Sequence, residues 1–249
     1  MNDRNNARRR LQIDGAYNVR DLGGYATLDG RETRWGTFLR ADSLYNLTPK
    51  AQASLVDFGV RAVIDLRTSR QIQASPNPFF GSSEVDYYHQ NLIGDVLPYE
   101  KMESGEALER IVQVYTSVLD TRHSQVRETL ATMAAPDARP VLFHCGAGKD
   151  RTGLIAALLL GIAGVPDATI AEDYALTARF MVEAHIEDNP QLTAGNYTWK
   201  DYQDASCPPE AMIATLAHLR SRYGGVEEYA AAIGLNSDLI DGLRDAILA

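Results

Sequence analysis

The sequence is poor in cysteine and has no apolar segment long enough to cross a membrane. Cys145 and Cys207 are the only cysteines among its 249 residues. So few thiols argue against a disulfide framework and are typical of a reducing compartment. The longest apolar run, residues 154–165, is shorter than the roughly 20 residues that a transmembrane helix needs. We therefore expect a globular protein without disulfides and without a transmembrane segment.

The first residues also lack the apolar core of a signal peptide. Residues 1–15 have the sequence MNDRNNARRRLQIDG, in which Arg8, Arg9 and Arg10 form a small basic cluster. We expect residues 1–15 to be a flexible polar terminus with these arginines solvated. The expected location is the cytoplasm, with export that uses no recognisable signal peptide as the alternative.

An excess of acidic groups argues against a nucleic-acid partner. The chain has 33 Asp and Glu against 24 Lys and Arg, which gives a formal net charge of −9. That charge disfavours binding to nucleic acid or to anionic lipid surfaces. His89, His123, His185 and His218 lack the spacing of metal ligands, so we expect no metal site and no cofactor.

Short apolar segments alternate with helical segments along the chain. Strands are predicted at residues 36–42, 62–66, 85–92 and 140–144. Helices are predicted at residues 48–58, 105–134 (two helices, broken near 121–124), 152–164 and from 167 to the C-terminus with one interruption. This order predicts an α/β fold with a mostly parallel central sheet, flanked by helices on both faces and followed by a helical C-terminal part. Residues 16–249 should form one domain.

Two polar features of the sequence have structural explanations. The glycine pair at 23–24 predicts a turn, and we assign Arg20 and Asp21 to that turn rather than to a functional site. Cys207 stands beside two prolines and is expected in a loop, without a role in chemistry.

The segment HCGAGKDRTG, residues 144–153, joins the last predicted strand to the helix that follows. A glycine-containing turn at a helix start gathers backbone N–H groups and suits an oxyanion. A nucleotide-binding Walker A loop would need Ser or Thr after Gly148-Lys149 and a glycine at position 143. The chain has Asp150 and Phe143 there instead, so we exclude a Walker A loop.

Cys145 adds a nucleophile that a simple anion site does not need. A thiol at a helix N-terminus, beside lysine and arginine, ionises more readily than a free one. A thiolate within a phosphate cradle can attack phosphorus. The alternative is that Cys145 is only a small buried apolar residue.

The loop resembles the HCxxGxxR[ST] signature of cysteine-dependent protein tyrosine phosphatases. GKDRTG, together with the upstream segments NVRDLGGY, LRADSL and AVIDLRTSR, is similar to the bacterial members of that family. The resemblance implies a phosphatase in which Cys145 is the nucleophile and Arg151 clamps the phosphate. It implies that His144 orients the loop, and that Thr152 bonds the sulfur as it leaves.

The same resemblance assigns phosphate binding to the loop residues Gly146, Ala147, Gly148 and Lys149. In this family a lysine at that position accompanies activity on phosphoinositides as well as on phosphotyrosine. We therefore expect phosphotyrosine proteins or peptides as the first substrates, with phosphoserine, phosphothreonine and phosphoinositides as further ones. Residues 167–209 lie where family members carry a lid over the pocket, although a packing role is the alternative.

The general acid cannot come from a WPD loop, because neither Trp35 nor Trp199 begins that motif. The family resemblance points to Asp150, although a carboxyl group at a helix start is expected to be ionised until a phosphate dianion binds. Asp150 could also serve as a helix N-cap. Asp65 is the rival acid, and Arg67 is expected to support the site by pairing with Asp65 or Asp150.

Two further functions remain as alternatives. A rhodanese-like sulfurtransferase also has a cysteine in an anion-binding loop, but that loop is usually shorter and has no Lys-Asp-Arg run. A non-catalytic phosphate-binding module of the same fold would commonly have lost the cysteine or the arginine, and this chain has both.

Overall fold

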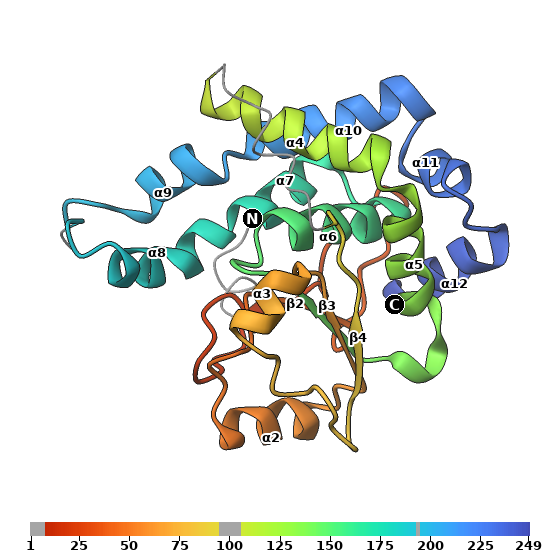
Figure 1. The fold of residues 1–249 in the computed structure, drawn as a ribbon. Helices are drawn as coiled ribbons and strands as arrows, with labels where there is room; N and C mark the ends of the chain where they lie inside the picture. Colours follow the sequence, from red (N-terminus) through yellow and green to blue (C-terminus); the bar gives the residue numbers. More distant parts are fainter. Residues whose placement is uncertain (1–7, 95–105, 193–194) are drawn as a thin grey trace.

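The computed structural model describes residues 8–94, 106–192 and 195–249 (Figure 1). The start of the helix predicted from residue 105 lies outside these ranges, as do residues 1–7 of the predicted N-terminal segment. In Figure 1 the sheet lies at the centre, with most helices on one side and α2 on the other.

The sheet has five strands in the order β1-β2-β5-β3-β4. The strands are β1 (Arg20–Asp21), β2 (Phe38–Ala41), β3 (Ala62–Asp65), β4 (Asp86–His89) and β5 (Val141–His144). Only β1 is antiparallel to its neighbour, so the predicted mostly parallel sheet is confirmed. The register aligns the last residues of β2, β5 and β3, which brings three carboxyl ends to one edge.

Apart from α3 (Ser69–Ala74), which was not predicted, the helices follow the expected order along the chain. They are α2 (Pro49–Phe58), α3 (Ser69–Ala74), α4 (Ala107–Thr121), α5 (His123–Ala134), α6 (Asp150–Ile162), α7 (Asp167–Ala175), α8 (Thr177–Asp188), α9 (Trp199–Ser206), α10 (Pro209–Tyr223), α11 (Val226–Ala232) and α12 (Ser237–Ile247). A short 3₁₀ turn, η2 (Pro136–Ala138), precedes β5. The break predicted near 121–124 is confirmed, because Arg122 separates α4 from α5.

Apolar side chains on opposite faces of the strands build two cores. The larger core joins Ile64 and Phe143 to α4–α7 and α10–α12, whereas the smaller core joins Val63 and Leu142 to α2. Successive strand residues point to opposite faces, which is why neighbours in the sequence enter different cores. Helices therefore cover both faces, unequally. Among the described residues, no helix combines the length and the apolar character that crossing a membrane requires.

In the basic cluster near the N-terminus, Arg9 differs from the prediction of solvated arginines, whereas Arg8 is exposed. The guanidinium carbon of Arg8 lies 4.3 Å from the centre of the Trp35 ring, and that of Arg9 lies 3.8 Å from the centre of the Tyr25 ring. Arg9 is almost fully buried and donates to the Gly23 carbonyl. A guanidinium plane packs well on an aromatic face, and this packing holds residues 8–10 against the domain.

The segment 167–209 has two different environments. Helix α7 is buried against α6 and α10, with Ile170 and Tyr174 in the larger core. Helices α8 and α9 pack on each other and project from the body of the molecule (Figure 1). The lid predicted over 167–209 therefore has a candidate in α8 and α9, whereas α7 packs as part of the core.

Candidate active site

Residues 145–149 form a loop between the carboxyl end of β5 and the start of α6. The Gly146 carbonyl accepts a 2.7 Å hydrogen bond from the Ser43 N–H, which ties the loop to the end of β2. Gly148 has a φ of +64°, and a Cβ built there would lie 2.4 Å from the Ala41 carbonyl oxygen. The tight curve of the loop thus depends on glycine at 148. Cys145 opens the loop and is 2% exposed.

Two buried side chains hold the loop from behind. Asn18 Nδ2 donates to the Ala147 carbonyl at 3.0 Å, and the Arg40 guanidinium donates to the Gly148 carbonyl at 2.7 Å. Carbonyl groups bonded in this way do not face an incoming anion. The arrangement favours an anion cradle made of the N–H groups of the loop.

Asp173 of α7 connects these supports. Its carboxylate accepts from Arg20 at 3.1 Å, from Arg40 at 2.5 Å and from the Tyr25 hydroxyl at 2.8 Å. Burial opposes the charge on Asp173, but attraction to the two arginines outweighs it and lowers the pKa of this carboxyl. Arg20 also donates to Asn18. Two guanidinium groups thus share one carboxylate, and the Arg40 guanidinium places a positive charge directly behind the loop.

This group of residues was not predicted from the sequence. Arg20 and Asp21 are predicted in a turn, whereas they form β1 and are buried. The available signal was in NVRDLGGY and LRADSL, because buried arginines require a carboxylate partner. That partner, Asp173, lies 153 residues from Arg20 and 133 from Arg40, so no local pattern identifies it.

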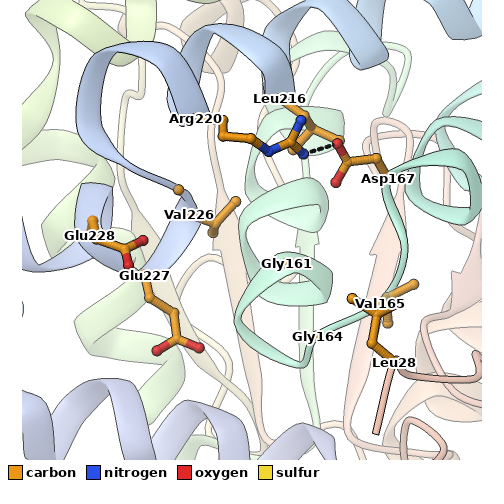
Figure 2. A pocket seen from close by; sticks show the side chains of 11 residues that line it. Leu28, Gly161, Gly164, Val165, Asp167, Leu216, Arg220, Val226, Glu227 and Glu228 are labelled. Carbon is orange, nitrogen blue, oxygen red and sulfur yellow. Dashed lines mark hydrogen bonds and ion pairs between the residues drawn. The ribbon is translucent and has the colours of Figure 1, made fainter. Parts of the chain in front are cut away.

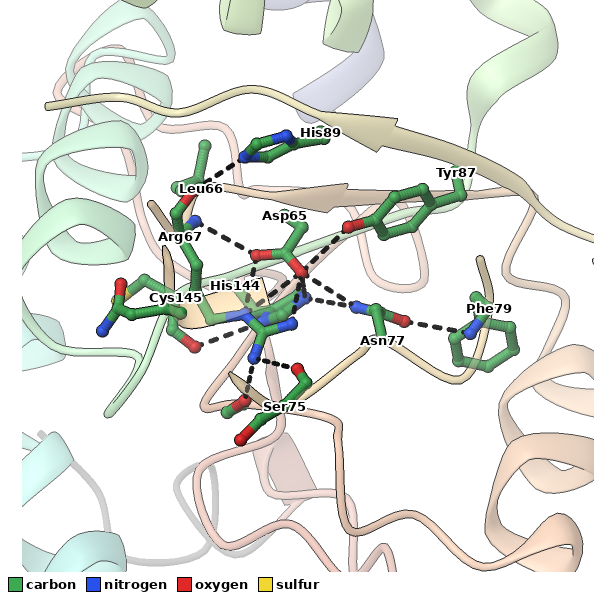
Figure 3. A network of polar contacts seen from close by, with 12 residues as sticks. Asp65, Leu66, Arg67, Ser75, Asn77, Phe79, Tyr87, His89, His144 and Cys145 are labelled. Atoms are coloured by element: carbon green, nitrogen blue, oxygen red, sulfur yellow. Dashed lines mark hydrogen bonds and ion pairs between the residues drawn. The ribbon is translucent and has the colours of Figure 1, made fainter. Parts of the chain in front are cut away.

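Asp65, at the end of β3, is the centre of a second polar group (Figure 3). It pairs with Arg67 at 2.7 Å, and its Oδ2 lies 3.4 Å from His144 Nε2. The Asn77 amide and the Tyr87 hydroxyl also donate to Oδ2, at 3.2 and 3.1 Å. Burial opposes the charge on Asp65, but His144 and Arg67 outweigh it and lower its pKa. Of the two partners predicted for Arg67, the structure has Asp65.

His144 lies between this group and the loop. It is fully buried, its Nδ1 lies 3.2 Å from the Cys145 carbonyl oxygen, and its Nε2 lies 2.8 Å from the Asn77 amide. Contacts on both ring nitrogens fix the plane of the imidazole. The ring therefore holds Cys145, the first residue of the loop, in a defined position relative to the edge of the sheet.

Arg151, the second residue of α6, extends over the start of the loop. Its guanidinium donates to Gln71 Oε1 at 2.8 Å and to the Leu66 carbonyl at 3.3 Å. It also lies 3.8 Å from the position that a Cβ on Gly146 would occupy. Gln71, which sequence analysis did not identify, is itself fixed because its Oε1 accepts from the Thr68 N–H. These contacts orient the guanidinium toward the cradle.

Asp150 is the first residue of α6 and does not cap the helix. The N-cap position belongs to Lys149, which makes no side-chain capping bond. The Asp150 carboxylate instead accepts a 2.5 Å hydrogen bond from the Tyr115 hydroxyl, and the Lys149 ammonium lies 3.7 Å away. The Lys149 and Asp150 side chains are 17% and 27% exposed, so both can reach a substrate.

Thr152 and Cys207 are both buried near the loop. Among the residues that the structure describes, Thr152 Oγ1 has no hydrogen-bond partner, so the bond expected to the Cys145 sulfur is not formed. Cys207 is fully buried at the end of α9, and burial raises the pKa of its thiol to about 12. A thiol of that kind stays protonated at neutral pH and is a poor nucleophile.

Two pockets lie near α6 and differ in their relation to the loop. One, of about 260 Å³, adjoins Lys149 and has an apolar wall that includes Ile111, Val114 and Ala205. The other, of about 360 Å³, is lined in part by Gly161, Arg220 and Glu227 and includes none of the loop residues (Figure 2). Over residues 8–94, 106–192 and 195–249, no cluster of three or more His, Cys, Asp or Glu side chains is placed to hold a metal ion.

Comparison with known proteins agrees with this geometry. A sequence model described as "Tyrosine phosphatase family" matches residues 11–249. The chain belongs to the tyrosine phosphatase family. A tyrosine-protein phosphatase of Nostoc commune is 32% identical over 83% of this chain and 72% of that protein. The triple specificity protein phosphatase PtpB of Mycobacterium tuberculosis is 28% identical over 94% of this chain and 93% of that protein.

The similarity to solved structures is weaker. A crystal structure of P. aeruginosa TpbA in complex with pTyr has a TM-score of 0.37 and 16% sequence identity, and the match covers 84% of this chain and 94% of that chain. That similarity is too low to inform substrate or mechanism. The family match alone establishes this tyrosine phosphatase as a hydrolase of phosphorylated substrates.

Proposed function

We propose that the phosphatase acts through a phosphocysteine on Cys145, with phosphotyrosine as its first substrate. The observation that carries this proposal is the position of Cys145 at the start of a loop whose carbonyls are held from behind and which Arg151 overlies. The loop N–H groups and Arg151 would bind the three terminal phosphate oxygens, which aligns phosphorus with the sulfur.

Two chemical steps follow from this arrangement. In the first, the Cys145 thiolate forms an S–P bond as the P–O bond to the leaving group breaks, and Asp150 gives its proton to the departing oxygen. In the second, Asp150 takes a proton from water, the water oxygen bonds to phosphorus, and the S–P bond breaks to release phosphate and the thiolate. Thr152 would bond the sulfur in that step after a rotation of its hydroxyl.

We assign the general acid to Asp150 rather than to Asp65. Asp65 is fully buried, has a lowered pKa and directs Oδ2 at His144, Arg67, Asn77 and Tyr87. The Asp65 carboxyl therefore has no proton to donate at neutral pH, and its buried side chain cannot contact a bound substrate. Asp65 and Arg67 would instead support His144, whereas the partly exposed Asp150 can meet the leaving group.

We extend the proposal to phosphoserine, phosphothreonine and phosphoinositides. Lys149 places a second positive charge beside the loop and adjoins a pocket of about 260 Å³. The M. tuberculosis relative is named a triple specificity phosphatase, and that name is consistent with broad specificity in the protein described here. Lys149→Ala should reduce turnover of a phosphoinositide more than that of a phosphotyrosine peptide, because a second phosphate loses its partner. An equal loss on both would remove phosphoinositides from the proposal.

The assay that tests the mechanism is hydrolysis of p-nitrophenyl phosphate without added metal. Cys145→Ser should abolish turnover and keep vanadate binding, because the cradle consists of backbone and Arg151. Activity that survives in Cys145→Ser, or that requires a divalent ion, would contradict the proposal. Consumption of thiosulfate would favour a sulfurtransferase, and binding without turnover in the wild type would favour a non-catalytic module.

We also propose that the phosphatase works in the cytoplasm, with export as the alternative. Both of its cysteines are free and buried, which suits a reducing compartment. Cell fractionation with an antibody to the protein tests this location directly.

A further inference from the structure

Tyr115 donates a short hydrogen bond to the side chain of Asp150. Its hydroxyl lies 2.5 Å from Asp150 Oδ1 and 2.8 Å from the hydroxyl of Tyr174. The two rings pack edge to face, with centres 6.0 Å apart, and each is 1% exposed. Tyr115 comes from α4 and Tyr174 from α7, so two helices distant in sequence are joined through these hydroxyls to Asp150.

The direction of these hydrogen bonds follows from protonation. Burial, and then the charge of Asp150, raise the pKa of both tyrosine hydroxyls well above the usual value. Both hydroxyls therefore keep their proton at neutral pH. Tyr115 has one proton to give and gives it to the carboxylate, so its oxygen accepts the proton of Tyr174. The result is a chain that runs from Tyr174 through Tyr115 to Asp150.

This chain distinguishes the two oxygens of Asp150. Among the described residues, both contacts of the carboxylate, from Tyr115 and from the Lys149 ammonium, are made at Oδ1. Oδ1 is thus the oxygen that carries the negative charge. A proton on Asp150 belongs on Oδ2, which neither contact occupies.

We propose that Tyr115 is a positioning residue that fixes Asp150 so that Oδ2 passes the proton to the leaving group and later takes one from water. This inference rests on the proposed function, in which Asp150 is the general acid. Tyr174 acts one step further back, because its hydroxyl holds Tyr115 in the donating orientation.

Tyr115→Phe tests the inference, because it removes one oxygen and keeps the ring. A donor to the carboxylate favours the ionised form, so its loss should move the alkaline limb of the kcat/KM profile upward by about one pH unit. Below that limb, where protonation no longer differs between variant and wild type, the lost positioning should lower kcat/KM about tenfold with phenyl phosphate. The fall should be less than about twofold with p-nitrophenyl phosphate, whose departure needs little protonation.

Tyr229→Phe is the matched control. Tyr229 is also fully buried, belongs to the same core and donates to the Leu119 carbonyl of α4 at 2.9 Å, but does not contact Asp150. Loss of the Tyr229 hydroxyl should lower the melting temperature of the protein and leave the alkaline limb of the kcat/KM profile unchanged. Should Tyr115→Phe not fold, Tyr174→Phe should shift the alkaline limb in the same direction by a smaller amount.

Asp150→Asn separates failure of the inference from failure of the proposed function. If Asp150→Asn removes the alkaline limb but neither tyrosine variant moves it, the inference is overturned and the acid assignment stands. If the limb persists in Asp150→Asn, the acid assignment fails and the role of Tyr115 fails with it. Equal loss on both substrates in Tyr115→Phe, with an unmoved limb, would also overturn the inference and make Tyr115 a packing residue.

Discussion

Gly148 is the residue at which the shape of the loop depends on a single missing atom. Its φ of +64° brings the backbone against the end of β2, where the Ala41 carbonyl oxygen would lie 2.4 Å from a Cβ. At the same residue the carbonyl accepts from Arg40. Because the backbone at Gly148 lies so close to β2, the buried Arg40 guanidinium can bond to its carbonyl. A change in the conformation of Gly148 would therefore also remove this hydrogen bond.

Gly148→Ala should lower both stability and activity. Strain at a positive φ costs roughly 1–3 kcal/mol, and the contact with Ala41 adds to it. Urea unfolding and p-nitrophenyl phosphate turnover measure the two effects. Gly30→Ala is the matched control, because Gly30 has a φ of +87° and nothing within 4 Å of a built Cβ. A smaller loss in Gly148→Ala than in Gly30→Ala would contradict the structural role of the contact.

At the scale of elements, α7 and the α8–α9 pair have different attachments to the domain. Helix α7 contributes Asp173 to the support of the loop and Tyr174 to the chain that ends at Asp150. In α8, by contrast, the buried residues are Thr177, Ala178 and Phe180, all in the first half of the helix. The position of α7 is therefore coupled to the loop at residues 145–149, whereas the outer part of α8 has few buried residues to hold it.

Hydrogen exchange should distinguish these helices. Amide protons of α7 should exchange only through global unfolding, and those of the second half of α8 and of α9 through local opening. If α8 and α9 close over the pocket, vanadate should slow their exchange in the wild type. Vanadate-bound Arg151→Ala, in which the ligand loses its clamp, should show less slowing. Equal protection of α7 and α9 without ligand would contradict the proposed lid.

At the scale of the whole molecule, two buried carboxylates hold the carboxyl edge of the sheet. Asp65 joins the ends of neighbouring strands, and Asp173 links β1 and β2 to helix α7. Asp65 and Asp173 both have a pKa lowered by their cationic partners. A carboxyl whose folded-state pKa is lowered contributes stability that is fully present above its unfolded value, 3.8. That contribution is lost as the pH falls through the folded pKa. Acid should therefore weaken the contacts that hold the loop.

Asp173→Asn should lose about 3–5 kcal/mol of unfolding free energy at pH 7, because it leaves two buried arginines without their partner. The gap between variant and wild type should shrink as the pH falls from 5 to 2. Asp29→Asn is the control, because the Asp29–Arg31 pair is about half exposed and contributes little. Urea unfolding across this range measures both gaps, and a gap for Asp173→Asn that does not change with pH would contradict the linkage.

The chemistry proposed for the loop and the order of the main elements follow from local features of the amino-acid sequence. Short apolar segments predict the parallel strands, residues 48–58 predict α2, and HCGAGKDRTG indicates an anion site. These features depend on neighbouring residues, since turns, caps and strand patterns are local in the chain. That is why they could be predicted without coordinates.

The residues that support the loop are known only from the folded structure. Asp173 meets Arg20 and Arg40 from more than 130 residues away, and Tyr115 reaches Asp150 across 35 residues. Arg20 was assigned to a turn because local sequence reveals the glycines beside it but not the carboxylate it meets. Contacts between distant segments are fixed by how helices pack on the sheet, and packing depends on the whole chain.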